Sequence, residues 1–286
     1  MIQRKGKTPA DNRPRIGPKA SEDEDDFAAG GVKGGLTLRT LAPNAVTTAA
    51  MCSGLTGILF AISGTWPLAV GAIILAGVLD GMDGRIARML NGQSRFGAEL
   101  DSLADSLSFG TAPAIVIYLW SLSATPRIGW IAALAFAVCA ALRLARFNAR
   151  IDATDQPHKS AGFLTGIPAP VGAGLAFLPF YLWTTTGIET FRNPLLVGPW
   201  VALMALLMIS NVATLSWASL KPRRDVRLWL LALAGLLFAG LLLEPWWTLA
   251  TISIVYLALL PLGWTRYARI KRQRARQGAV GTDETL

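Results

Sequence analysis

The sequence predicts an all-α integral membrane protein, and three observations lead to this fold class. Hydrophobic residues make up 52% of the 286 residues. Charged residues make up 16%, against about 25% in soluble domains, so the chain lacks the polar surface of a soluble enzyme. Its apolar residues gather in runs long enough to span a bilayer. The net charge of +9 does not indicate a nucleic-acid-binding protein, because the basic residues of such proteins lie on a polar background.

Eight segments meet the requirement of about 20 mostly apolar residues for a transmembrane helix. They are residues 41–62, 66–90, 97–121, 128–150, 164–186, 195–218, 226–243 and 246–265. Most of the ten Trp residues fall near the proposed helix ends, as in the aromatic belt of a membrane interface. Cys52 and Cys139 lie inside apolar runs, which excludes a disulfide framework.

The two ends of the chain are expected outside the membrane. Residues 1–36 show no apolar periodicity and contain an acidic cluster at 21–26, which favours a disordered tail. Residues 268–286 are expected to form a basic tail that can touch anionic lipid head groups. With eight spans, 25 of the 27 Lys and Arg residues fall on one side, and only Arg127 and Arg192 on the other. Basic residues prefer the cytoplasmic side, so both termini are predicted to be cytoplasmic, with the chain in the cell (inner) membrane.

Four carboxylates interrupt the second and third apolar segments. Asp80 and Asp83 are three residues apart, and Asp101 and Asp105 are four apart, so each pair shares one helix face. The intervening turn can bring the two pairs together, whereas Glu99 is expected to point away from them into water. Carboxylates inside a membrane helix are costly and indicate a partner or a function. Converged oxygen ligands favour Mg²⁺, Mn²⁺ or Ca²⁺ over zinc, and two such ions suit phosphoryl chemistry.

Two other interpretations of these carboxylates remain open from the spacing alone. They can form structural ion pairs with nearby cations, for which Arg85, Arg88 and Arg95 are available. They can also serve a cation-coupled transporter. Transporters often contain internal repeats, and the later spans hold no second copy of the Asp pattern, which disfavours transport.

The segment 80–105 resembles the signature of the CDP-alcohol phosphatidyltransferase family, which reads D-x2-D-G-x2-A-R-x8-G-x3-D-x3-D. Every fixed position and the spacer match. The resemblance implies a six-helix core, expected over 37–220, and a homodimer with a cytoplasmic active site. Residues 221–267 are then two additional transmembrane helices.

The resemblance also implies roles for individual residues. Asp80, Asp83 and Asp101 would bind two divalent cations, Mg²⁺ or Mn²⁺ with Ca²⁺ as a further option. Asp105 would contact an ion and act as the general base. The segment 43–47 is similar to the family's P-N-x-x-T element. The residues expected to bind CDP-diacylglycerol are Asn44, Thr47, Gly84, Ala87, Arg88 and Gly97.

Three further stretches, 106–114, 141–148 and 163–170, resemble the bacterial integral-membrane phosphatidylserine synthases of this family. They imply transfer of the phosphatidyl group of CDP-diacylglycerol to the hydroxyl of L-serine, with release of CMP, in phospholipid biosynthesis. The serine carboxylate needs a cation, and Arg143 and Arg146 share a helix face. Asn148 is a further candidate for the polar groups of serine. Glycerol 3-phosphate, an inositol phosphate and choline remain alternative acceptors.

Overall fold

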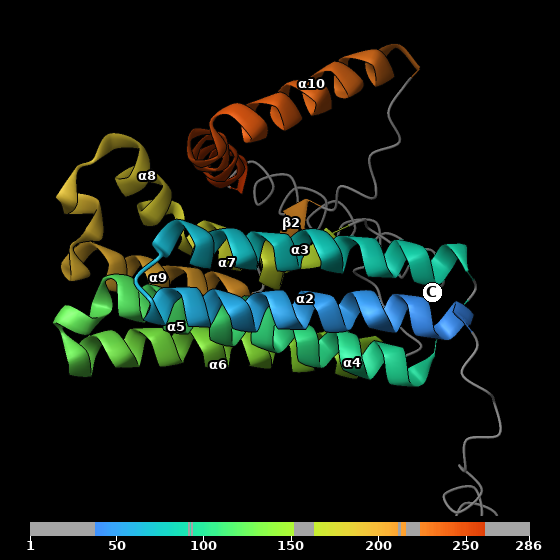
Figure 1. The fold of residues 1–286 in the computed structure, drawn as a ribbon, viewed down its shortest axis with the longest axis horizontal. Coiled ribbons are helices and arrows are strands. Elements are labelled where there is room, and N and C mark those ends of the chain that lie inside the picture. Colours follow the sequence, from blue (N-terminus) through green and yellow to red (C-terminus); the bar gives the residue numbers. More distant parts are fainter. Residues whose placement is uncertain are drawn as a thin grey trace, which may run out of the picture. The chain divides into compact units, whose positions relative to one another are not determined.

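The computed structural model describes residues 38–90, 92, 94–151, 163–210, 213–215 and 224–260 (Figure 1). These residues belong to one compact unit that begins at Leu38. The expected tails at 1–36 and 268–286 lie outside the described residues.

Four helical segments are long and apolar enough to cross a membrane, and they match the first four predicted spans. They are Leu41–Ile62, Trp66–Met89, Arg95–Trp120 and Pro126–Ala149. The first, second and fourth lie in α2 (Leu38–Ile62), α3 (Trp66–Met89) and α6 (Pro126–Ile151). The third consists of α4 (Arg95–Asp105), a π-helical turn η1 (Ser106–Thr111) and α5 (Ala112–Trp120).

Small residues allow these helices to approach closely. A Cβ on Gly57 of α2 would lie 2.9 Å from the carbonyl oxygen of Ala69 on α3. A Cβ on Gly54 would lie 2.6 Å from Ser108 Oγ in η1. Side chains at either glycine would force the helices apart, so α2 packs directly against both neighbours (Figure 1).

The start of α4 is set by a side-chain cap. Ser94 has extended backbone angles, and its Oγ accepts a hydrogen bond from the backbone N–H of Gly97 at 3.0 Å. This bond satisfies one of the free donors at the helix start. Because α4 begins here, Asp101 and Asp105 come to lie in the second and third turns of the helix.

The π-helical turn follows Asp105 directly. Pro113 near its end has no N–H to donate, and Thr111 Oγ1 donates a hydrogen bond back to the carbonyl oxygen of Ser106 at 3.3 Å. π-Turns within α-helices occur frequently at functional sites. This one lies in the first of the stretches noted above, between Asp105 and the membrane-embedded α5.

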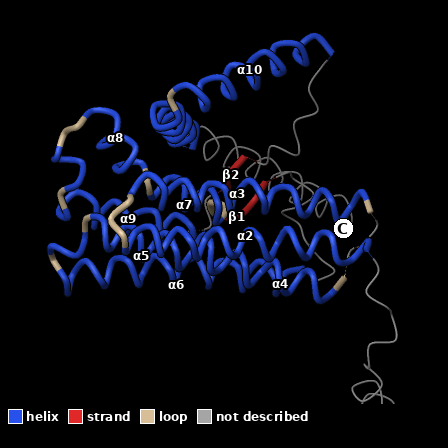
Figure 2. Tube along the Cα trace, viewed as in Figure 1, coloured by secondary structure: helices blue, strands red, loops and turns tan. Residues whose placement is uncertain are grey.

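The predicted spans 164–186 and 195–218 are wrong as single helices. The first is divided into a strand β1 (Phe163–Thr165) and two short helices, α7 (Ala169–Ala176) and α8 (Leu178–Thr186). The second forms α9 (Pro194–Ile209) and then a strand β2 (Ala213–Leu215). β1 and β2 pair antiparallel (Figure 2), so the all-α prediction holds apart from these two strands.

Backbone chemistry explains the interruption that hydropathy did not predict. Gly166 has φ +78°, and a Cβ there would lie 2.6 Å from the carbonyl oxygen of Met208. Only glycine fits this position at low cost. Pro168 and Pro170 then prevent the helix from extending backwards, and Pro179 lies just after the break between α7 and α8.

The last predicted spans correspond to α10 (Arg224–Leu243) and a final helix, Pro245–Leu260. Both, like α9, are shorter apolar helices within the described residues, which contain four helices long enough to span a membrane. One face of the final helix packs against the main core through residues that include Trp246, Leu249 and Leu257. The Trp246 ring lies 5.4 Å from that of Phe180 on α8, edge to face. By contrast, the large side chains of α10 are exposed.

Candidate active site

Three carboxylates converge where α3 and α4 carry their polar residues. Asp80, Asp101 and Asp105 each offer one oxygen, and these oxygens all lie within 4.8 Å of one another. All three side chains are half-buried. Asp105 Oδ1 is fully buried and has no hydrogen-bond partner. A set of hard oxygen donors with one orphaned oxygen fits a divalent cation such as Mg²⁺ or Mn²⁺. We call these residues the carboxylate triad.

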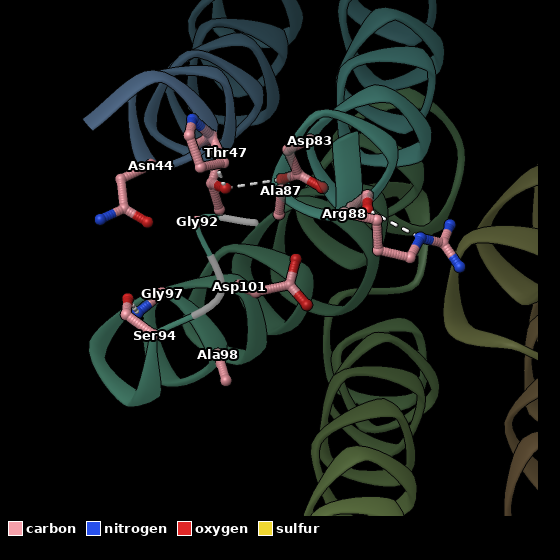
Figure 3. A pocket seen from close by; sticks show the side chains of 12 residues that line it. Asn44, Thr47, Asp83, Ala87, Arg88, Gly92, Ser94, Gly97, Ala98 and Asp101 are labelled. Atoms are coloured by element: carbon pink, nitrogen blue, oxygen red, sulfur yellow. Dashed lines mark hydrogen bonds between the residues drawn. The ribbon is translucent and has the colours of Figure 1, made fainter. Parts of the chain in front are cut away.

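Asp83 lies outside the triad and has a different environment. It is 5% exposed, and its Oδ2 accepts a hydrogen bond of 2.6 Å from Thr47 Oγ1 on α2 (Figure 3). Thr47 Oγ1 also lies 3.1 Å from the carbonyl oxygen of Pro43. The contact joins the P-N-x-x-T element to the Asp signature, two segments that are 36 residues apart in sequence.

No ion pair joins the four Asp residues to Arg85, Arg88 or Arg95, all of which are described in the structure. Arg88 instead donates from Nε to the carbonyl oxygen of Gly84 at 3.0 Å (Figure 3). The structural interpretation of the carboxylates, which needs such pairs, therefore finds no support here.

A cavity of about 400 Å³ opens beside Asp83 and Asp101, and we call it the Gly84 pocket (Figure 3). All six residues that the resemblance associates with CDP-diacylglycerol line it. They are Asn44, Thr47, Gly84, Ala87, Arg88 and Gly97. The structure thus brings together residues of α2, α3 and α4 that the sequence holds in two separate motifs.

The two signature glycines contribute to this pocket in different ways. A Cβ on Gly97 would lie 2.8 Å from Asn44 Oδ1, so glycine leaves room for the Asn44 side chain. A Cβ on Gly84 would meet nothing within 4 Å. Gly84 is therefore not required by packing within the described protein, and its small size instead keeps open space in the cavity.

A second cavity of about 880 Å³ lies on the other side of Asp101, and we call it the Arg143 pocket. Its lining includes Asp105 of the triad together with Arg143 and Asn148 of α6. Asn148 Nδ2 donates to Ser102 Oγ on α4 at 2.9 Å. Arg143 Nε is buried without a hydrogen-bond partner. Asp101 lines both cavities and Asp105 lines the second, so two of the three triad residues face a pocket and Asp101 faces both.

The structure separates the two arginines that the sequence placed on one face. Arg146 does not line the Arg143 pocket, and its Nη1 donates to the carbonyl oxygen of Ile209 on α9 at 3.3 Å. Arg143 lies within electrostatic range of the Asp105 carboxylate and of the Tyr256 phenol. Helix periodicity puts Arg143 and Arg146 on one side of α6 but does not say which neighbour each will meet.

Two residues near this pocket were missed by sequence reasoning. Glu99 is exposed and lies outside the triad, as expected, but it also lines the Arg143 pocket, which the sequence did not indicate. Tyr256 comes from the final helix, more than a hundred residues after Arg143. The sequence signal for Glu99 is its position three residues before Ser102 on α4. For Tyr256, the helical spacing from Trp246 through Leu249 and Ser253 marks a buried face.

Comparison with known proteins agrees with this geometry. Residues 40–217 match the CDP-alcohol phosphatidyltransferase family, and residues 225–261 match the family described as CDP-alcohol phosphatidyltransferase 2. The chain is 38% identical to a CDP-diacylglycerol–serine O-phosphatidyltransferase of Mycobacterium tuberculosis, over 79% of each chain. Relatives with the same name occur in Mycobacterium leprae (36% identity over 77% of this chain and 73% of the relative) and Helicobacter pylori (34% over 60% and 70%). The chain belongs to the CDP-alcohol phosphatidyltransferase family.

Proposed function

We propose that this protein transfers the phosphatidyl group of CDP-diacylglycerol to the hydroxyl of L-serine and releases CMP. One observation carries the proposal. Asp101 of the carboxylate triad lines two pockets of different character, one lined by small residues of the family signature and one containing the half-buried Arg143, whose Nε has no hydrogen-bond partner. A transferase of this kind must hold a nucleotide donor and an acceptor on opposite sides of one reacting phosphorus. The relatives bear the name of the serine enzyme.

The donor binds in the Gly84 pocket in this proposal. Gly84, Ala87 and Gly97 leave space for the nucleotide, and Asn44 and Thr47 offer hydrogen-bonding groups to the cytidine side. Arg88 lies on the rim and carries a positive charge that can face the diphosphate. The Thr47–Asp83 hydrogen bond holds the P-N-x-x-T element against the signature helix, so donor binding depends on both motifs.

The acceptor binds in the Arg143 pocket. The Arg143 guanidinium pairs with the serine carboxylate, and Asn148, held by Ser102, contacts its polar groups. Asp105 takes the proton from the serine hydroxyl as the general base. The serine oxygen then forms a bond to the β-phosphorus of CDP-diacylglycerol, the bond from that phosphorus to the bridging oxygen breaks, and CMP departs with the electron pair.

Two divalent cations, Mg²⁺ or Mn²⁺ with Ca²⁺ as a further option, fit the donor set. Asp80, Asp101 and Asp105 would hold one or both ions through the triad, and Asp83 would complete the set. When bound, such ions offset the negative charge of the diphosphate and of the leaving CMP. We expect a chelator to abolish CMP release and added Mg²⁺ or Mn²⁺ to restore it.

We place both termini and the active site on the cytoplasmic side of the cell (inner) membrane. Arg85, Arg88, Arg95 and Arg143 lie at the same helix ends as the triad, whereas Arg127 begins α6 at the opposite end. This distribution follows the positive-inside rule. A homodimer is expected from the family resemblance.

The test is CMP release by the purified protein in detergent, supplied with CDP-diacylglycerol, Mg²⁺ or Mn²⁺ and one acceptor at a time. We expect release with L-serine, and phosphatidylserine as the lipid product by mass spectrometry. Release with glycerol 3-phosphate, an inositol phosphate or choline but not with L-serine would overturn the assignment of the acceptor. Absence of CMP with every acceptor would overturn the transferase activity itself.

A further inference from the structure

The Arg143 pocket contains a charge that the proposed reaction leaves unused. Its charged lining residues are Arg95, Glu99, Asp101, Asp105 and Arg143. Asp101 and Asp105 belong to the carboxylate triad, and Arg143 is assigned to the carboxylate of the acceptor. Glu99 is therefore the anionic residue of this lining that has no role in the reaction as described above.

Glu99 is free to bind a ligand. Its side chain is exposed at the pocket and makes no hydrogen bond or ion pair with any residue that the structure describes. Arg95 precedes it by one turn of α4 and is also exposed, but the two do not form an ion pair. The Glu99 carboxylate is therefore not held by Arg95 in an ion pair and is open to a ligand in the pocket.

Glu99 and Asp105 both come from α4 and line the Arg143 pocket. Six residues turn an α-helix by about 600°, so the two side chains leave α4 about 120° apart. The Glu99 carboxylate is therefore separate from the carboxylate triad while facing the same cavity as Arg143.

We propose that Glu99 binds the ammonium group of the acceptor and thereby selects a zwitterionic amino alcohol over an anionic one. The inference rests on the proposed function and names a specificity residue of the same site. L-serine carries one positive and one negative charge, which Glu99 and Arg143 match. A phosphorylated acceptor would place its negative charge beside Glu99, and an acceptor without a carboxylate would leave Arg143 Nε unpaired.

The experiment compares wild type, Glu99→Gln and Glu99→Asp with two acceptors, L-serine and 3-hydroxypropanoate, which lacks the ammonium group. We expect Glu99→Gln to raise the KM for L-serine about tenfold, the effect of losing one hydrogen bond to a charged group. The KM for CDP-diacylglycerol and the rate with 3-hydroxypropanoate should stay unchanged. Glu99→Asp keeps the charge and should recover part of the affinity. Glu244→Gln, the same change at an exposed residue beyond α10, is the matched control.

The outcomes separate this inference from the proposed function. If wild type uses L-serine and Glu99→Gln leaves the KM for L-serine within twofold, the ammonium assignment is wrong and the proposed function stands. An equal loss with 3-hydroxypropanoate would also overturn the assignment, because that acceptor has no ammonium group to lose. If wild type does not use L-serine at all, both proposals fail together.

Discussion

Two half-buried arginines at opposite ends of the helix bundle have different partners. At the end away from the triad, Arg192 donates from Nε to the carbonyl oxygen of Trp120 at 2.9 Å. Its guanidinium carbon also lies 5.8 Å from the Trp66 ring centroid and 5.4 Å from that of Trp183. At the triad end, Arg143 Nε is buried and has no hydrogen-bond partner.

The difference separates a structural cation from a binding cation. Buried polar groups in proteins are nearly always hydrogen-bonded, and contacts of the kind that Arg192 makes stabilise the fold. A buried donor without a partner, such as Arg143 Nε, instead costs stability, and a ligand that accepts its hydrogen bond recovers that cost. One donor at the aromatic end, Trp120 Nε1, is also unpaired, but it is neutral and its burial costs less than that of a charge.

The largest expected effect comes from removing the proposed base. Asp105→Asn should lower kcat by about 10²- to 10⁴-fold, because general-base catalysis contributes a factor of that size. Binding of CDP-diacylglycerol, measured by calorimetry or by protection against heating, should persist, since Asp105 does not line the Gly84 pocket. Near-normal turnover in this variant would remove the base assignment.

The two arginines give the second prediction, which tests the comparison directly. Arg143→Gln should raise the KM for L-serine about ten- to hundredfold, the range for hydrogen bonds to a charged group, with an unchanged or higher melting temperature. Arg192→Gln should leave both KM values unchanged and lower the free energy of unfolding by about 1–3 kcal/mol, seen as a lower melting temperature in detergent. A higher KM for L-serine in Arg192→Gln, together with a lower melting temperature in Arg143→Gln, would contradict these two roles.

Two glycines of α3 give the third prediction. Gly→Ala inside a helix stabilises by about 0.5–1 kcal/mol, and a Cβ on Gly84 or Gly81 meets nothing within 4 Å. Both Gly84→Ala and Gly81→Ala should therefore raise the melting temperature. Only Gly84 lines the Gly84 pocket, so only its variant should also raise the KM for CDP-diacylglycerol severalfold. Equal KM values in the two variants would argue against nucleotide binding in this pocket.

The smallest expected effect concerns the final helix. Tyr256→Phe keeps the ring that packs on the core and removes the hydroxyl near Arg143. We expect the KM for L-serine to rise about two- to fivefold, as for a single neutral hydrogen bond or less, without a change in kcat. Tyr118→Phe is the matched control, because Tyr118 packs against Trp130, its ring centroid 5.2 Å away. If Tyr256→Phe and Tyr118→Phe change the KM for L-serine equally, the final helix contributes to packing of the bundle and not to acceptor binding.

Sequence reasoning predicted those parts of the fold that depend on local chemistry. The first four spanning helices follow from long apolar runs, and the spacing of Asp80, Asp101 and Asp105 anticipated their convergence. The fifth and sixth segments are not single continuous helices, and hydropathy does not register a left-handed Gly166 or the missing donors of nearby prolines. The exposure of Glu99 was predicted correctly, but its place in the Arg143 pocket was not, because that cavity is formed with α6, which helix periodicity does not locate.

The amino-acid sequence by itself determined that this chain lies in a membrane, which residues carry its charge and which family signature it contains. Hydropathy, charge and motif spacing depend on residues that are close together in the sequence, so the sequence alone is enough to identify them. Only the tertiary structure decided that Thr47 contacts Asp83 and that Asp101 lines both pockets. It also decided that Arg146 donates to α9, whereas Arg143 Nε has no hydrogen-bond partner. Those outcomes depend on which helix faces which, and that choice is made by packing among segments far apart in the chain.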